Sequence, residues 1–189
     1  MAAPATIGEV DVMRPARQGD FDGFCGIYSL INALEVAGFS TPRSAVHQRI
    51  FVALTDALPN RKLRVAIDRG LKGKDLVRAS RVAFPDFEKR IGGEVSISRP
   101  FRHSSVESSD AVFRALGALM GTNSAVIIHL STPAYRHWTV VQAIEPTSIV
   151  LRDSWTLRSL PLDRFSTEGR YQVDVRETIL VRIKRAEDA

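Results

Sequence analysis

The spacing of apolar residues changes once along this chain, and this change constrains the fold more than any other feature. In the first half, apolar residues recur at the helical spacing i, i+3, i+4, i+7, as in Ile27, Leu30, Ile31 and Leu34. This pattern predicts a helix over about residues 25–37. Further helices are expected from Thr41-Pro42 to about residue 58 and over 75–84, with a basic loop containing a short helical piece over 60–73.

The second half has the spacing of strands. Residues 94–98 alternate between apolar and polar, and a helix capped by Ser109 follows them and ends at Gly121. Strands are then predicted over 125–130, 137–144, 149–153, 171–175 and 178–183. We therefore expect an α+β fold with N-terminal helices packed on a C-terminal antiparallel sheet. A single domain, 1–189, is expected, helical over about 1–90 and a sheet with one helix over about 91–189.

Composition excludes several classes of protein. The chain of 189 residues has one cysteine, Cys25, so an intramolecular disulfide and a thiolate-rich metal site are excluded, and a reducing compartment is expected. The four histidines show no HExxH spacing, and we expect neither a metal nor a cofactor. The sequence has no apolar run of the roughly 20 residues that a membrane span needs and no signal-peptide pattern. We expect a soluble, cytoplasmic protein, with export as an effector as the alternative.

Positive charge is concentrated in one segment. The formal net charge is +5, and residues 61–90 contain ten lysines and arginines against four acidic residues. Such a segment is either a solvated surface or a contact surface for an acidic partner. It lacks the regularly interleaved aromatic residues of single-strand binding proteins, so nucleic acid is not the expected partner.

The single cysteine lies where a nucleophile is useful. Cys25 begins the first predicted helix, and the free N–H groups and positive dipole end of a helix favour a thiolate over a thiol. The alternative is a buried cysteine that serves as a small apolar residue.

His137 and Asp153 are the candidate base and orienting carboxylate. His137 begins a predicted strand after a loop, and Asp153 ends the next one. A hairpin loop of odd length centred on Glu145 would place His137 directly opposite Asp153, at the distance for a carboxylate to hold an imidazole. A loop of two or four residues would place them on opposite faces. His129 lies inside an apolar run, where we expect a hydrogen-bonded core histidine.

Gln18 completes the predicted site. It precedes Cys25 by seven positions, and its side-chain amide, with the Cys25 backbone N–H, is the candidate donor to the oxyanion of a tetrahedral intermediate.

In this order, Gln18, Cys25-Gly26, His137 and Asp153 resemble the papain-like cysteine peptidase superfamily, although the gap between glutamine and cysteine is one residue longer than in papain. Asp153-Ser-Trp is similar to the Asn-Ser-Trp motif of papain-type enzymes. His137-Trp-Thr-Val-Val-Gln-Ala-Ile resembles peptidases that process double-glycine leader peptides, and Phe24-Cys-Gly-Ile-Tyr-Ser-Leu-Ile-Asn-Ala-Leu resembles phytochelatin synthases. The middle of the chain, residues 42–124, matches no member of the superfamily.

These residues predict a cysteine peptidase or isopeptidase that cleaves an amide bond of a peptide or protein through a Cys-His-Asp triad and a thioester. Two alternatives stay open. One is transfer of the same acyl group to an amine or thiol, as in a transpeptidase, transglutaminase or deamidase. The other is a catalytically inactive papain-like module that binds an acidic partner through residues 61–90.

Overall fold

The helices and the sheet occupy separate parts of the molecule, as the change of period predicts. This computed structural model describes residues 23–39, 45–104, 108–132, 135–162, 165–166 and 171–185. The helices are α1 (Cys25–Val36), α2 (Ala45–Asp56), α3 (Asn60–Arg69), α4 (Gly73–Ala83), α5 (Glu88–Ile91) and α6 (Ser109–Leu119), with 3-10 turns η1 (Phe84–Phe87) and η3 (Val175–Glu177). The strands are β1 (Glu94–Ser98), β2 (Ser124–Ser131), β3 (Arg136–Ile144), β4 (Ser148–Arg152), β5 (Ser159–Pro161), β6 (Phe165–Ser166), β7 (Tyr171–Val173) and β8 (Ile179–Lys184).

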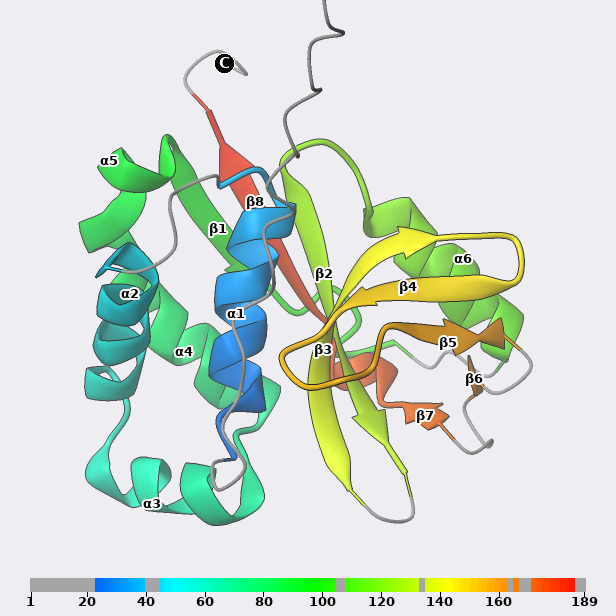
Figure 1. Cartoon of the computed structure of the whole chain (residues 1–189), viewed down its shortest axis with the longest axis horizontal. Coiled ribbons are helices and arrows are strands. Elements are labelled where there is room, and N and C mark those ends of the chain that lie inside the picture. Colours follow the sequence, from blue (N-terminus) through cyan, green and yellow to red (C-terminus); the bar gives the residue numbers. More distant parts are fainter. Residues whose placement is uncertain are drawn as a thin grey trace, which may run out of the picture.

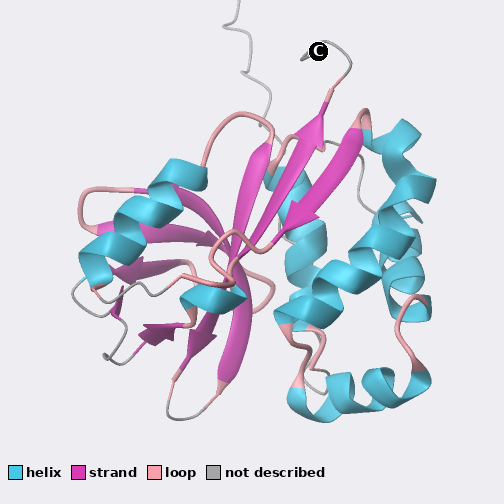
Figure 2. Cartoon of the chain, turned by 180° about the vertical axis from the view of Figure 1, so that it is seen from behind, coloured by secondary structure: helices cyan, strands magenta, loops and turns pink. Residues whose placement is uncertain are grey.

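The strands form one sheet in the order β1-β8-β2-β3-β4-β5, and β7 pairs with the end of β2 and with β6. Pairing is antiparallel except between β6 and β7, which run parallel. The α+β prediction is therefore confirmed. Two views from opposite sides show α1 and α6 on opposite faces of the sheet, with α2, α3 and α4 beside α1 (Figures 1 and 2).

Helix α1 is the centre of the larger core. Its apolar stripe of Ile27, Leu30, Ile31 and Leu34 is at most 2% exposed, and it packs against α2, α4 and one face of the sheet. A second core fills the space between α6 and the opposite face, where Val112 and Leu116 meet the even-numbered residues of β2. The sheet is thus covered on both faces where β2 and β3 cross its middle, which fixes β3 beneath α1.

The predicted elements are mostly confirmed, with boundaries shifted by one to three residues. The predicted helix start at Thr41-Pro42 lies outside the described residues, and α2 is described from Ala45. The prediction for 60–73 was wrong: residues 60–69 form the ten-residue helix α3. Leu63, Ala66 and Ile67 do follow the helical spacing i, i+3, i+4, but of these three only Ala66 is fully buried. The short strands β5 and β6 were not predicted.

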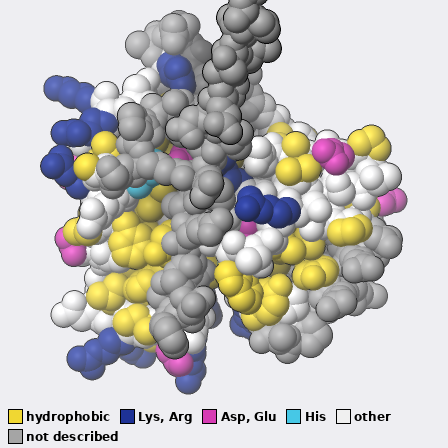
Figure 3. All heavy atoms as spheres, viewed as in Figure 1, with side chains coloured by type: hydrophobic (Ala, Val, Ile, Leu, Met, Phe, Trp, Pro, Cys, Tyr) yellow, Lys and Arg dark blue, Asp and Glu magenta, His cyan; other side chains and the backbone are white. Residues whose placement is uncertain are grey.

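Basic side chains lie at the outside of the helical half. Lysine and arginine gather along the outer edge of the helical layer in the face of Figure 3.

Within the described ranges, no helix combines the length and the apolar character needed to cross a membrane.

Candidate active site

Cys25 is the first residue of α1, as predicted. Phe24 occupies the N-cap position, and its side chain makes no capping hydrogen bond with the first helical N–H groups. These donors and the positive end of the helix dipole therefore face the space around Cys25. The thiol is 6% exposed, and its sulfur lies 4.0 Å from the carbonyl oxygen of Gly23.

A glycine allows α1 to approach its neighbours closely. A Cβ atom at Gly26 would lie 2.7 Å from Cδ1 of Leu76 in α4 and 3.2 Å from Cδ1 of Trp138 in β3. The Trp138 indole N–H donates a 2.8 Å hydrogen bond to the carbonyl of Leu71, so the strand is also tied to the segment between α3 and α4. The N-terminus of α1 is thus held against the first residues of β3.

The register of the β3–β4 hairpin differs from the prediction. Its last pair is Ile144 with Ile149, so the loop has four residues, which by itself would put His137 and Asp153 on opposite faces. A β-bulge between Val141 and Ala143 adds one residue to β3 and restores the common face. The partner of Val140 is Arg152, and continuing this register places Asp153 next to Thr139 and diagonal to His137. The predicted direct pairing of His137 with Asp153 was therefore wrong, although the two side chains do meet.

The imidazole of His137 and the carboxylate of Asp153 form a buried hydrogen bond. His137 Nε2 lies 2.6 Å from Asp153 Oδ1, and the two side chains are 6% and 1% exposed. Asp153 Oδ2 accepts hydrogen bonds from the backbone N–H groups of Trp155 at 3.0 Å and Leu157 at 3.2 Å. Because Nε2 donates to the carboxylate, Nδ1 is the ring nitrogen left for a second partner.

Cys25 is the second group that acts on this imidazole. Burial alone would lower the pKa of His137, but hydrogen bonds to Asp153 and to Cys25, together with the charges of both groups, outweigh burial and raise it to about 9. Burial alone would raise the pKa of Asp153, and the hydrogen bond and positive charge of His137, with the hydrogen bond from the Trp155 backbone, lower it instead. Both groups are therefore charged near neutral pH, with His137 as an imidazolium between two acidic partners.

A cavity of about 480 Å³ opens beside Cys25. Its lining carries charges of both signs, among them Lys62 of α3, which forms a 2.9 Å ion pair with Asp75 of α4. His129 also lines this cavity, half-buried, with its ring 4.7 Å from that of Trp138. Burial lowers the pKa of His129.

The prediction of a hydrogen-bonded core histidine at position 129 was wrong. His129 Nδ1 is buried and has no hydrogen-bond partner among the described residues. Its odd position on β2, shared with Ile127, was the available signal, because that face of the strand lies towards α1.

Two aromatic side chains flank His137. The ring of Trp155 lies 6.3 Å from the imidazole and that of Tyr135 also 6.3 Å, and the two aromatic rings are 5.8 Å apart and nearly perpendicular. Trp155 is 54% exposed and Tyr135 is 36% exposed. The imidazole is thus next to an apolar surface that solvent reaches from its far side.

The described histidines at positions 47 and 103 lie in other surroundings. Gln18 lies outside the described residues. His47 of α2 lies 3.5 Å from Glu35, and His103 follows β1. In the part of the chain that the structure describes, no group of three His, Cys, Asp or Glu side chains is placed to hold a metal ion.

Comparison with known proteins adds one finding. No protein-family model matches the sequence, and no curated protein matches it either. The crystal structure of a candidate C39-like peptidase from Bacillus anthracis is similar, with a TM-score of 0.53 over 93% of this chain and 96% of that chain, at 12% sequence identity. At this identity the likeness concerns the fold, and the chain has the α+β, papain-like fold of that C39-like peptidase.

Proposed function

We propose that the chain is a cysteine peptidase or isopeptidase in which Cys25 is the nucleophile, His137 the general base and Asp153 the orienting carboxylate. The observation that carries the proposal is the buried 2.6 Å hydrogen bond of His137 Nε2 to Asp153, together with the interaction of Cys25 with the same imidazole. A peptidase-like function also agrees with the fold of the C39-like neighbour.

The reaction follows from the proton that His137 carries. The Cys25 thiol gives its proton to His137 Nδ1, and the thiolate attacks the carbonyl carbon of an amide bond. The oxygen becomes negative and lies near the free N–H groups at the start of α1. Gln18 is a predicted second donor to this oxygen. His137 then protonates the leaving amine, which departs and leaves a thioester on Cys25.

Hydrolysis of the thioester completes the cycle. His137, neutral after giving up its proton, takes a proton from water, and the hydroxide attacks the thioester carbonyl. The carboxylic acid product leaves, and Cys25 and His137 return to their charged pair. Asp153 holds the ring through Nε2 in both half-reactions and stabilises the imidazolium.

Cleavage of a peptide library tests the proposal. The protein is incubated with peptides from a digested proteome, and new N-termini are counted by mass spectrometry. We expect a consistent cleavage pattern that the Cys25→Ala variant loses by at least about 10³-fold. Thermal unfolding of this variant should stay within a few degrees of the wild type, because a small side chain replaces another. Equal cleavage by wild type and Cys25→Ala would contradict the proposal.

The same experiment separates hydrolysis from transfer. With an added primary amine, a hydrolase gives carboxylic acid products, whereas an acyltransferase gives the amide of the added amine. If acyl transfer is the main reaction, the roles of Cys25, His137 and Asp153 stay the same. The one difference is that an amine or thiol, rather than water, attacks the thioester.

A further inference from the structure

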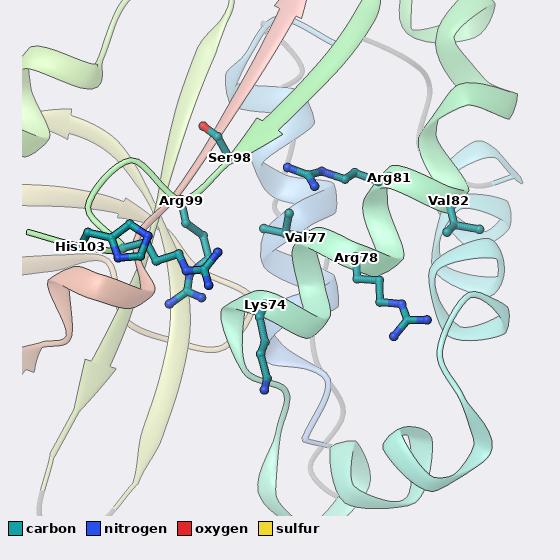
Figure 4. A pocket seen from close by; sticks show the side chains of 9 residues that line it. Lys74, Val77, Arg78, Arg81, Val82, Ser98, Arg99 and His103 are labelled. Atoms are coloured by element: carbon teal, nitrogen blue, oxygen red, sulfur yellow. The ribbon is translucent and has the colours of Figure 1, made fainter.

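A second cavity, of about 620 Å³, lies between α4 and the turn that follows β1. It shares no lining residue with the Cys25 cavity. Figure 4 shows its side chains coming from two sides, one set from α4 and the other from the end of β1 and the turn. We call it the basic cavity, because its charged lining residues are Lys74, Arg78, Arg81, Arg99 and Arg102.

Most of this positive charge is uncompensated. No carboxylate lines the basic cavity, and among the described residues Lys74, Arg78, Arg81 and Arg102 take part in no ion pair. Like charges that converge on one space repel each other, and a bound anion removes this repulsion. The Cys25 cavity differs, because its basic and acidic residues are mixed.

Arg99 has the stronger structural contacts of the two arginines that bind the backbone here, since Arg81 donates one hydrogen bond of 3.5 Å to the Ile97 carbonyl. Arg99 donates hydrogen bonds of 2.7 Å to Glu177 and to the carbonyl of Arg176, and its side chain is 14% exposed. Its Nε is buried and has no hydrogen-bond partner within the described residues. Glu177 also accepts a hydrogen bond from the Gly73 backbone at the start of α4, so Arg99 fixes one wall of the cavity.

The lining indicates the chemistry of the ligand. Four of the five cationic residues are arginines, whose planar guanidinium groups bind phosphate oxygens in pairs. The apolar lining consists of Val77, Val82 and the aliphatic parts of the basic side chains, and the imidazole of His103 is the one aromatic ring among the lining residues. The volume is that of a site for a small molecule. Lys74, Arg78 and Arg81 come from α4, and Arg99 and Arg102 come from the turn after β1, so the cations approach the cavity from two sides.

We propose that the basic cavity binds a compact anion that carries at least two phosphate groups. The two cavities share no lining residue, although Glu177, which lines the Cys25 cavity, pairs with Arg99 of the basic cavity. The proposal for the basic cavity does not rest on the proposed catalysis.

Calorimetric titration with inorganic tripolyphosphate at physiological salt tests this proposal. We expect saturable binding at one site, with orthophosphate at least tenfold weaker. The double variant Lys74→Gln/Arg102→Gln should weaken binding of tripolyphosphate at least tenfold. The single variant Ser98→Glu should weaken binding of tripolyphosphate more than the double variant does. This substitution adds a carboxylate at Ser98, an exposed residue at the end of β1 that lines the cavity.

A matched variant controls for loss of net charge. Lys89→Gln/Arg90→Gln removes two positive charges from α5, outside the cavity, at residues that are also exposed. This variant should bind within about twofold of the wild type. Equal losses in the two double variants would overturn the proposal in favour of non-specific attraction, and thermal unfolding of each variant establishes that it is folded.

Two further ligands, phosphoinositide vesicles and hexaglutamate, show whether the bound anion is a free phosphate compound, a lipid headgroup or an acidic peptide. Tripolyphosphate in solution and phosphatidylcholine vesicles with a bisphosphorylated phosphoinositide distinguish a free ligand from a lipid headgroup, and saturable binding to either supports the phosphate site. Hexaglutamate distinguishes an acidic peptide. If hexaglutamate binds more tightly than tripolyphosphate, the surface is a protein contact and the proposal is wrong.

Discussion

Two buried histidine–carboxylate pairs meet the chain at the end of β4. One is Glu35 with His47, which Arg152 contacts, and the other is Asp153 with His137. Arg152 and His47 both approach Glu35 of α1, with Arg152 Nε at 2.9 Å and His47 Nε2 at 3.5 Å from its oxygens. The next residue, Asp153, lies 2.6 Å from His137, and no lysine or arginine pairs with it among the described residues. All five side chains are at most 13% exposed.

The difference between the two pairs lies in the source of the positive charge. In the first pair a guanidinium neutralises the carboxylate permanently, because arginine does not lose its proton in proteins. Arg152 thereby ties Glu35 of α1 to β4. In the second pair the imidazole itself carries the charge, so the pair gains and loses a proton. Neighbouring residues thus form a structural brace that contains an arginine and a pair without one, to which we assign proton transfer.

Exchanging each histidine for glutamine should give the largest contrast. His137→Gln should lower turnover of a substrate from the peptide library by about 10³-fold, because the general base is lost. His47→Gln should leave turnover within about threefold when the rates are compared per folded molecule. Equal losses of turnover in the two variants would remove the distinction between brace and site.

Replacing Arg152 should lower the free energy of unfolding and leave the turnover per folded molecule little changed. Arg152→Gln leaves Glu35 buried without its cation, and we expect the free energy of unfolding in urea to fall by about 3 kcal/mol. Arg158→Gln, at an exposed position in the same loop region, should change it by less than about 0.5 kcal/mol. A loss below 1 kcal/mol in Arg152→Gln would show that the pair is not a brace.

The stability contributed by His137 should depend on pH in a defined direction. The folded protein raises the pKa of His137 from 6.5 to about 9, so the imidazolium stabilises the fold fully below pH 6.5 and this stabilisation disappears as the pH rises through 9. The difference in free energy of unfolding between wild type and His137→Gln should therefore shrink by roughly 2–3 kcal/mol from pH 6 to pH 9.5. A difference that is constant over this range would contradict the charged state assigned to the ring.

The sequence predicts elements well where one face of them is buried. The stripe of α1 and the apolar run of β2 identify these elements, because burial imposes a period of 3.6 or 2 residues. Helix α3 was missed because it buries little more than Ala66.

Residue type and order name Cys25, His137 and Asp153 as candidates, but they do not give the geometry of the His137–Asp153 contact. The β3–β4 register rests on the bulge at Gln142, which no local pattern marks. The contact of Glu35 with Arg152 could not be predicted from the sequence either. These residues are 117 positions apart, and the packing of α1 on β4 brings them together. Placing His129 beside the Cys25 cavity requires knowing which face of β2 lies towards α1, and residue type alone does not give this.

The pH dependence of alkylation tests the central claim most directly, because Cys25 is the only cysteine. The rate with iodoacetamide would be measured from pH 5 to pH 9.5 on the wild type and on His137→Gln. If Cys25 and His137 form an ion pair, the wild-type rate should stay within about threefold between pH 6.5 and pH 8.5, and the variant should lose most of its rate at pH 6.5. A wild-type rate that falls about tenfold per pH unit below about pH 8.5, as for a free thiol, would contradict the account. So would the absence of any reaction in the folded protein.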